Sequence, residues 1–322
     1  MKIYIPNSAF IGNIESFIRN IDTENPKILE LTFNKYWISI HPVVLASIAA
    51  MAMYCKQNSI PIKAGKIGAK SGHYLERMGL LKYIGSKQKF PFVEHEPAGR
   101  FIPLTTISNT DDLKEFITDM IPLLHAEPHN VDPINYAVSE LIRNVLEHSA
   151  SPKGAIVCAQ YFKKSNRVAI GVADCGIGIK ESMDFSWNTV SHSHAIKLAL
   201  RPGITGTTRR KGGTEYNAGA GLFFTKSIAK VSGDYFMIYS GDTLYKLQRT
   251  PPSPQLELFP DPVLDRYSIK DKLPIWNGTC VGIDFSMNVN RKFQSLLRLI
   301  QNAYFDDVNP RKKKSFKKAQ FI

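Results

Sequence analysis

One stretch of the sequence limits the fold more than any other, the apolar run of residues 43–55. It is 13 residues long, and its most polar member is Ser47. A helix that crosses a bilayer needs about 20 apolar residues, so this run is too short for that role. It is long enough for a helix that is apolar on nearly every side, and such a helix must be buried. We therefore expect it to pack on a sheet.

The segments around this run predict a small α/β unit. Residues 27–33 alternate between apolar and polar side chains, and residues 60–64 form a second short strand pattern. Residues 73–81 have the pattern of a short amphipathic helix. This order of elements, with short connections, implies parallel strands joined by a right-handed crossover. We assign residues 1–90 to this first domain.

A change in composition predicts where the next domain begins. Residues 86–110 contain three prolines and one glycine and show no sustained period. We therefore interpret residues 91–110 as a linker. Residues 111–290 are predicted to form the second domain, and residues 291–322 a basic C-terminal tail.

The second domain is expected to contain both helices and strands. One helix is predicted over residues 111–124, and the next begins at Pro133 with Asp132 as its N-cap. A third helix is predicted over residues 222–232. Strands are predicted over 155–161 and 167–174, which form a hairpin, and over 235–239 and 279–285.

The helix that contains residues 134–149 carries a separate polar stripe. Glu140, Asn144, Glu147 and His148 lie at positions i, i+4, i+7 and i+8, beside an apolar face at helical spacing. A polar stripe by itself is typical of a helix face in contact with water. Three later features favour a binding site instead.

Glycine clusters follow this helix in a fixed order. Asp174 ends an apolar run and is followed by Gly176 and Gly178, where backbone can approach a ligand while the carboxylate accepts a hydrogen bond. Gly219 and Gly221 directly precede a predicted helix, whose first amides can bind an anion such as phosphate. Gly278 and Thr279 begin the last strand. Each cluster alone is typical of a turn, but the four features in this order are more specific.

These motifs resemble the GHKL ATPase superfamily, which includes gyrase, MutL, histidine kinases and anti-sigma-factor serine kinases. The resemblance rests on the segment of residues 139–148, on Asp174-x-Gly176-x-Gly178, on Gly219-x-Gly221 and on Gly278-Thr279, and it covers about residues 110–290. It implies a two-layer α/β sandwich of the Bergerat type, with a mixed, largely antiparallel sheet and ATP on its helical face.

The resemblance also implies roles for individual residues. Asn144 would ligate Mg²⁺, and Glu140 would be the general base for attack on the γ-phosphate. Asp174 would accept a hydrogen bond from the adenine amino group, with Thr279 assisting. The remaining binding positions are glycines and helix-start amides: Gly176 and Gly178 at the base, and Gly219, Ala220, Gly221 and Leu222 at the phosphates. Residues 179–218 correspond to the family's mobile ATP lid.

Three functions remain open at this point. The first is Mg²⁺-dependent ATP hydrolysis coupled to rearrangement of the lid and the N-terminal domain. The second is a serine/threonine kinase of the anti-sigma type, and the third is a non-catalytic ATP-dependent scaffold or nucleic-acid-associated module. Glu140, four residues before Asn144, disfavours the histidine-kinase branch. About 35 residues follow Met287, which are too few for the extra domain of a gyrase-type clamp.

The first domain resembles a STAS-like domain, the fold of anti-sigma-factor antagonists. That family places a phosphoacceptor hydroxyl at the start of its first long helix, after an Asp and before a Gly. Ser39 lies near the corresponding position, but the surrounding pattern is absent. We therefore expect a docking or dimerisation module that contacts a protein partner or a second copy of the chain.

The net charge of +13 is unevenly distributed. Residues 101–290 hold 19 basic and 19 acidic side chains, so the excess lies at the two ends. Residues 311–318 contain six basic residues in eight positions, a pattern of solvated tails that also suits nucleic acid or an acidic partner. Four scattered cysteines and an N-terminus without a signal-peptide pattern predict a cytoplasmic protein that does not enter a membrane.

Overall fold

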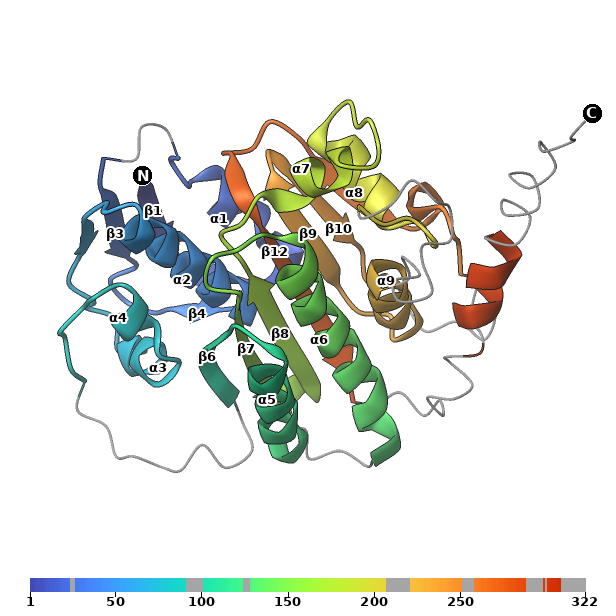
Figure 1. The fold of residues 1–322 in the computed structure, drawn as a ribbon. Coiled ribbons are helices and arrows are strands. Elements are labelled where there is room, and N and C mark those ends of the chain that lie inside the picture. Colours follow the sequence, from blue (N-terminus) through green and yellow to red (C-terminus); the bar gives the residue numbers. More distant parts are fainter. Residues whose placement is uncertain are drawn as a thin grey trace, which may run out of the picture.

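The computed structural model describes residues 1–23, 27–90, 101–123, 128–206, 221–250, 258–287, 298 and 300–307. The chain is a mixed α/β protein with a small parallel sheet near its N-terminus and a larger antiparallel sheet after it (Figure 1). None of the helices in these ranges is long and apolar enough to cross a membrane.

The N-terminal unit is built on a three-stranded parallel sheet in the order β1-β3-β5. Its strands are β1 (Lys2–Ile5), β3 (Leu29–Phe33) and β5 (Ile62–Ala64). The parallel pairing of β3 and β5 was predicted, whereas β1 was not. The long helix α2 (Pro42–Gln57) confirms the prediction for residues 43–55. Three short elements complete the first part of the unit: β2 (Ser8–Ala9), α1 (Glu15–Arg19) and β4 (Ser39–Ile40).

The prediction of a single helix over residues 73–81 is wrong, because the structure has two short helices there. They are α3 (Gly72–Arg77) and α4 (Leu80–Tyr83). Gly79 lies between them with a φ of 79°, in the left-handed region that ends a helix. The amphipathic pattern continues across the break, since Leu75 and Leu80 are both buried in the same core.

The larger sheet has seven strands in the order β11-β10-β9-β12-β8-β7-β6, and every neighbouring pair is antiparallel. The strands are β6 (Phe101–Ile107), β7 (Ala155–Phe162), β8 (Arg167–Ala173), β9 (Phe236–Gly241), β10 (Thr243–Leu247), β11 (Tyr267–Lys270) and β12 (Trp276–Ser286). The predicted β7–β8 hairpin is confirmed. β10 and β11 were not predicted.

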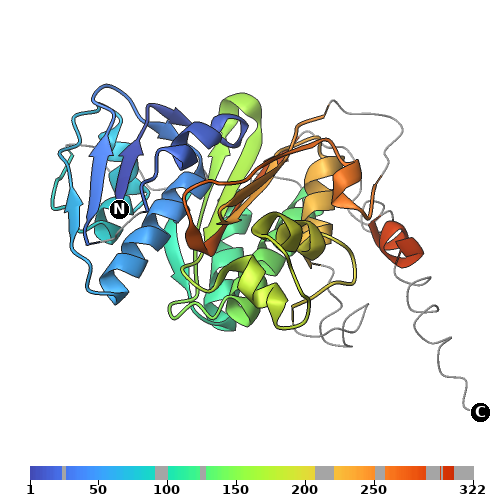
Figure 2. The same cartoon turned by 90° about the horizontal axis from the view of Figure 1, so that it is seen from above.

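Helices cover both faces of the seven-stranded sheet. The helices α5 (Thr110–Leu123), α6 (Pro128–His148) and α9 (Gly221–Val231) pack on one face. The helix α2 packs on the other face, so it lies between the two sheets (Figure 2). Alternate residues of β7 follow this division, with Val157 in the core under α6 and Cys158 in the core around α2.

Glycine allows α2 to approach the larger sheet closely. A Cβ atom on Gly171 of β8 would lie 2.3 Å from the backbone nitrogen of Val43, too close for any side chain. Val43 begins the part of α2 that is fully buried. The helix is apolar on all sides because it packs against a sheet on each side. The sequence predicted packing against only one sheet.

Two predicted boundaries are wrong. Residues 101–107, predicted as part of the linker, form the edge strand β6, where Pro103 falls in a register shift against β7. An edge strand tolerates proline because one side of it needs no donor. The helix predicted to start at Pro133 begins at Pro128, so Asp132 is not its N-cap and Pro133 lies inside it. The loss of one backbone hydrogen bond near the start does not end the helix.

Part of the predicted tail belongs to the fold. Residues 300–307 are helical, and Ile300 and Tyr304 are buried in the core beside α9. The ring centroids of Tyr304 and Phe224 are 6.2 Å apart. The basic run 311–318 lies outside the described residues.

Candidate functional site

A cavity of about 300 Å³ opens between α6, the start of α9 and the ends of β8 and β12. The helix α7 (Gly178–Asp184) and residues 204–206 close another side. Seven of the residues given a binding or catalytic role by the resemblance line this cavity: Glu140, Asn144, Asp174, Gly178, Gly221, Leu222 and Thr279. Gly176 lies next to it, bonded to Asp174. Gly219 and Ala220 lie outside the described residues.

The polar stripe of α6 faces the cavity. Glu140, Asn144, Glu147 and His148 all line it, while the opposite side of α6 is buried on the sheet through residues such as Val138. The stripe is therefore the wall of a pocket and not simply a solvated face.

Asp174 lies at the end of β8 with only 1% of its surface exposed. Its Oδ1 accepts a hydrogen bond of 2.7 Å from the backbone N–H of Gly176. Burial raises the pKa of this carboxyl to about 7, although the backbone N–H groups of Gly176 and Thr279 act in the opposite direction. Thr279 on β12 is held next to it, because its backbone carbonyl accepts from the Asp174 N–H at 2.9 Å.

The two glycine positions in the turn after Asp174 have no room for a side chain. A Cβ on Gly176 would lie 2.0 Å from the carbonyl oxygen of Ser149. Gly178 has a φ of 78°, and a Cβ there would lie 2.2 Å from the carbonyl oxygen of Asn277. The spaced glycines therefore allow the β8 end, the α6 end and the β12 start to meet around one carboxylate.

The start of α9 points at the polar stripe. A Cβ on Gly221 would lie 2.5 Å from Glu140 Oε2 and 3.5 Å from Asn144 Nδ2. The absence of a side chain leaves the first turn of this 11-residue helix open toward the cavity. Unpaired N–H groups at such a position attract anions.

The amide of Asn144 is the least satisfied group in this wall. Its Nδ2 is buried and has no hydrogen-bond partner among the described residues. Amide oxygen and nitrogen are interchangeable in such an assignment, so either atom can face the cavity. An unpaired buried amide is costly unless a ligand completes it.

Glu140 lies one turn away from Asn144 and is mostly buried. Burial raises the pKa of its carboxyl, whereas Arg143, with an N–O distance of 3.6 Å, lowers it and Glu147 raises it further. The residue therefore holds a proton more readily than an exposed glutamate does. A raised pKa makes this carboxylate a stronger proton acceptor than an exposed glutamate.

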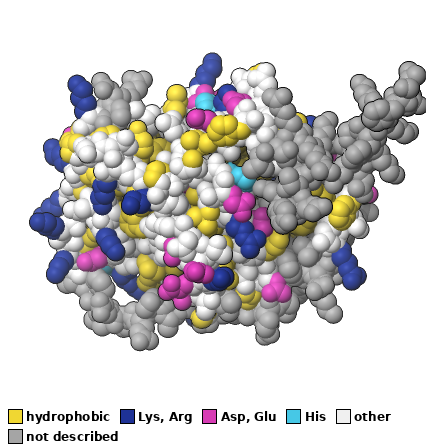
Figure 3. Space-filling view, in the orientation of Figure 1, with side chains coloured by type: hydrophobic (Ala, Val, Ile, Leu, Met, Phe, Trp, Pro, Cys, Tyr) yellow, Lys and Arg dark blue, Asp and Glu magenta, His cyan; other side chains and the backbone are white. Residues whose placement is uncertain are grey.

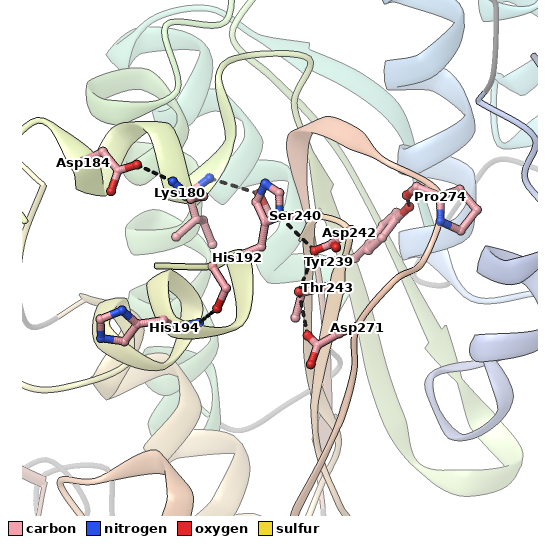
Figure 4. Close-up of polar contacts among 12 residues, drawn as sticks. Lys180, Asp184, His192, His194, Tyr239, Ser240, Asp242, Thr243, Asp271 and Pro274 are labelled. Atoms are coloured by element: carbon pink, nitrogen blue, oxygen red, sulfur yellow. Dashed lines mark hydrogen bonds and ion pairs between the residues drawn. The ribbon is translucent and has the colours of Figure 1, made fainter. Parts of the chain in front are cut away.

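Sequence reasoning missed the anchor that attaches the predicted lid to the sheet (Figure 4). Ser240 Oγ accepts from the Ile179 N–H at 3.0 Å and donates to the Gly278 carbonyl at 3.0 Å. His192, to which the sequence assigned no role, begins α8 (His192–Ala199), and its Nδ1 lies 2.8 Å from Asp242 Oδ1. These contacts join residues 38 to 61 positions apart, so no local pattern could reveal them.

The described part of the predicted lid has its own small core. Met183, Ala195 and Ile204 pack together, and the Trp187 indole N–H donates to the Thr205 carbonyl at 2.8 Å. The basic residues 209–211 lie outside the described residues.

The N-terminal unit contacts the site from the other side of the sheet. Gln57, at the end of α2, approaches Cys175 with an Oε1–Sγ distance of 3.6 Å. Tyr54 and Trp276 pack edge to face with centroids 5.9 Å apart. The turn that follows Asp174 is therefore in direct contact with α2.

Comparison of the chain with protein-family models gives no match, and comparison with curated proteins gives none either.

Proposed function

We propose that this cavity binds ATP with Mg²⁺ and that the protein hydrolyses it, as the resemblance to the GHKL superfamily implies. The observation that carries the proposal is the buried Asn144 Nδ2, which has no hydrogen-bond partner in the part of the chain that the structure describes and lies beside Glu140, opposite the open start of α9. A carboxylate, an amide and a helix N-terminus around one cavity form a set that suits a triphosphate and its metal ion.

Asp174 is proposed to select the base. A buried carboxylate that already accepts one backbone N–H has lone pairs left for a ligand donor, and the exocyclic amino group of adenine is such a donor. Thr279 lines the same end of the cavity and supplies a hydroxyl. The glycine turn leaves room for a flat ring beside them.

The phosphate end is proposed to lie between α6 and α9. The helix N-terminus at Gly221 and Leu222 offers backbone N–H groups to phosphate oxygens. Asn144 would supply an oxygen ligand to Mg²⁺, and the ion, when bound, neutralises charge on the phosphates. The raised pKa of Glu140 suits it to take a proton from the attacking water as the water oxygen bonds to the γ-phosphorus and the bond to the leaving ADP breaks.

Lid movement is the conformational change that we propose for the ATP cycle. The described lid elements have a small cluster of their own around Met183 and contribute two buried side chains, Ile196 and Leu200, to the core of the larger sheet. Polar contacts at Ser240 and Asp242 add to this attachment. The N-terminal unit shares a buried apolar core with the larger sheet, so displacing it would expose α2. The lid contributes far fewer buried apolar side chains to a shared core than the N-terminal unit does, which favours the lid as the moving part.

Incubation with γ-labelled ATP and Mg²⁺ tests the proposal. We expect tight binding by calorimetry and release of labelled inorganic phosphate. Asn144→Ala should weaken binding only when Mg²⁺ is present, because the side chain acts through the ion. Label transferred to a partner protein would identify a kinase instead, and unchanged binding in both Asn144→Ala and Asp174→Asn would overturn the site.

A further inference from the structure

The three parallel strands of the N-terminal unit end at one edge of their sheet. Because β1, β3 and β5 run in the same direction, the loops that follow them, residues 6–8, 34–38 and 65–71, lie together. Ligands of open α/β sheets commonly bind outside the carboxyl ends of the strands. Six side chains at this place define what we call the aromatic-basic edge: Tyr4, Lys35, Tyr36, Trp37, Lys66 and Lys70.

Asn34 fixes the backbone of the loop that carries Tyr36 and Trp37 and also contacts the Tyr4 side chain. Its backbone N–H donates to the Ile5 carbonyl at 2.8 Å, which joins the ends of β1 and β3. Its Nδ2 donates to the Tyr4 hydroxyl at 3.1 Å, and its Oδ1 accepts from the backbone N–H groups of Tyr36 and Trp37 at 3.0 and 3.2 Å. These bonds fix the loop that carries Tyr36 and Trp37, so the loop conformation does not depend on burial of the two rings.

The rings themselves are open to water. Tyr4 is 42% exposed, Tyr36 83% and Trp37 56%. Exposed aromatics at these levels are unusual when several lie together, because each contributes a large apolar area. Among the large exposed apolar side chains of the described chain, those at this edge are all aromatic.

The charge of the edge is entirely positive. The three loops contain Lys35, Lys66 and Lys70 and no aspartate or glutamate. All three lysines are exposed, and none forms an ion pair with another described residue. Residues 1–90 hold 12 basic and 5 acidic side chains, and lysine and arginine are spread over the N-terminal unit at the left of Figure 3.

The sheet behind the edge also presents polar and basic groups outward. The helix α2 covers one face of it, while Lys2, Tyr4 and Lys63 on the other face are exposed and the partly exposed Glu30 lies between the two lysines. Parallel sheets are usually covered on both faces. This outer face carries two lysines and one glutamate, so the purely positive surface is that of the loops, and Tyr4 joins the two.

We propose that the aromatic-basic edge binds single-stranded nucleic acid, with bases stacked on Tyr36, Trp37 and Tyr4 and phosphates contacted by the lysines. Stacking needs bases that are not already paired, which favours single strands over a duplex. Surface binding to a membrane commonly uses an amphipathic helix whose apolar face enters the lipid, whereas the residues of this edge lie in a strand and in loops. This activity goes beyond the proposed ATP hydrolysis and does not depend on it.

The test uses the full chain and fluorescein-labelled oligothymidylate and oligouridylate of about 20 nucleotides, in an anisotropy titration at several salt concentrations. The double variant Tyr36→Ala/Trp37→Ala should lose at least about tenfold in affinity at every salt concentration, since it removes stacking. The triple variant Lys35→Glu/Lys66→Glu/Lys70→Glu should bind more weakly. Its slope of log affinity against log salt should be shallower by about 2, because three phosphate contacts are lost.

Matched controls distinguish binding at the aromatic-basic edge from a general effect of charge and from binding by the basic residues 311–318. The variant Lys114→Glu/Lys153→Glu/Lys270→Glu makes the same charge change at exposed sites on the other domain, and Phe305→Ala removes a ring that is 51% exposed there. Both should bind as the wild type does, as should a chain lacking residues 308–322. Circular dichroism and unfolding midpoints should be unchanged in every variant, since all the replaced side chains are exposed.

Three results would overturn the proposal. The first is equal affinity in the wild type and both edge variants. The second is loss of binding when residues 308–322 are removed, which would assign the contact to that segment. The third is edge-dependent binding to vesicles of phosphatidylcholine and phosphatidylserine without binding to either oligonucleotide.

Discussion

The protonation state of Asp174 connects the fold to ligand affinity. Burial raises its pKa from 3.8 to about 7, so the side chain becomes protonated as the pH falls below neutrality. A protonated carboxyl has less capacity to accept the adenine amino group. We expect ATP affinity to weaken progressively below about pH 7 and to level off above it, which calorimetry across this range would measure. Asp174→Asn should bind weakly at all these pH values.

The same pKa shift predicts how stability depends on pH without ligand. Between about pH 4 and pH 7 the folded protein keeps a proton on Asp174 that the unfolded chain has released. The contribution of this group to the free energy of unfolding is therefore fully present below about pH 4 and is lost as the pH rises to about 7. The total loss is at most roughly 4 kcal/mol. Urea unfolding of the wild type and Asp174→Asn should show this slope only in the wild type. Equal slopes would contradict the buried, protonated state.

Glu140 and Glu147 lie on the same helix face and form a matched pair. Glu140 is mostly buried beside Gly221, whereas the Glu147 side chain is 55% exposed. Glu140→Gln should retain ATP binding and lose at least about 100-fold in phosphate release, because the general base is removed. Glu147→Gln should release phosphate at nearly the wild-type rate. Equal loss in both variants would remove Glu140 from its proposed role.

At the scale of elements, the close contact between α2 and the larger sheet depends on a glycine, Gly171 of β8. Gly171→Ala places a methyl group 2.3 Å from the Val43 backbone nitrogen, so α2 must move away from β8. We expect a destabilisation of about 3 kcal/mol in urea unfolding. Gly68→Ala is the control, because its Cβ has no neighbour closer than the Lys35 carbonyl at 3.6 Å and should change stability by less than about 0.5 kcal/mol. Equal stabilities of the two variants would show that α2 is not tightly docked.

The elements that the sequence predicted well are those with a strong local pattern. Residues 43–55 and the two strands of the β7–β8 hairpin are continuous apolar runs, and helix α6 has a clear apolar period, so each could be identified from its own sequence. The strands β10 and β11 are four or five residues long and flank a proline-rich segment, so their pairing is set by β9 and not by their own pattern. The strand β6 was missed because Pro103 is typical of a loop.

The candidate site shows the same division. The glycines and polar residues of the four motifs follow one another in sequence and could be brought together by pattern alone. The Ser240 and His192 contacts arise because α7 and α8 fold back over the end of β9, and tertiary packing of this kind has no local signal. The pKa values of Glu140 and Asp174 also could not be inferred from sequence, because they depend on burial.

At the scale of the whole molecule, the predicted division at residues 91–110 does not separate two cores. The core around α2 contains Ile3 and Leu31 of the small sheet together with Tyr239 and Cys280 of the larger one. Polar contacts also cross between them. His41 Nε2 lies 3.0 Å from Asp284 Oδ1, and Lys246 pairs with Glu15. An arrangement with one shared core is expected to unfold as one unit, unlike two domains joined by a linker.

Calorimetry tests this expectation together with the ATP site. We expect a single unfolding transition in which the calorimetric and van't Hoff enthalpies agree. ATP with Mg²⁺ at about 100 times its dissociation constant should stabilise that whole transition by about 2.7 kcal/mol. Because unfolding is shared, hydrogen exchange limited by global opening should slow in β1 and β3 as much as in β8. The opposite result would be two unfolding transitions, of which ATP shifts only one, together with unchanged hydrogen exchange in β1. That result would show that the N-terminal unit folds independently despite its buried contact.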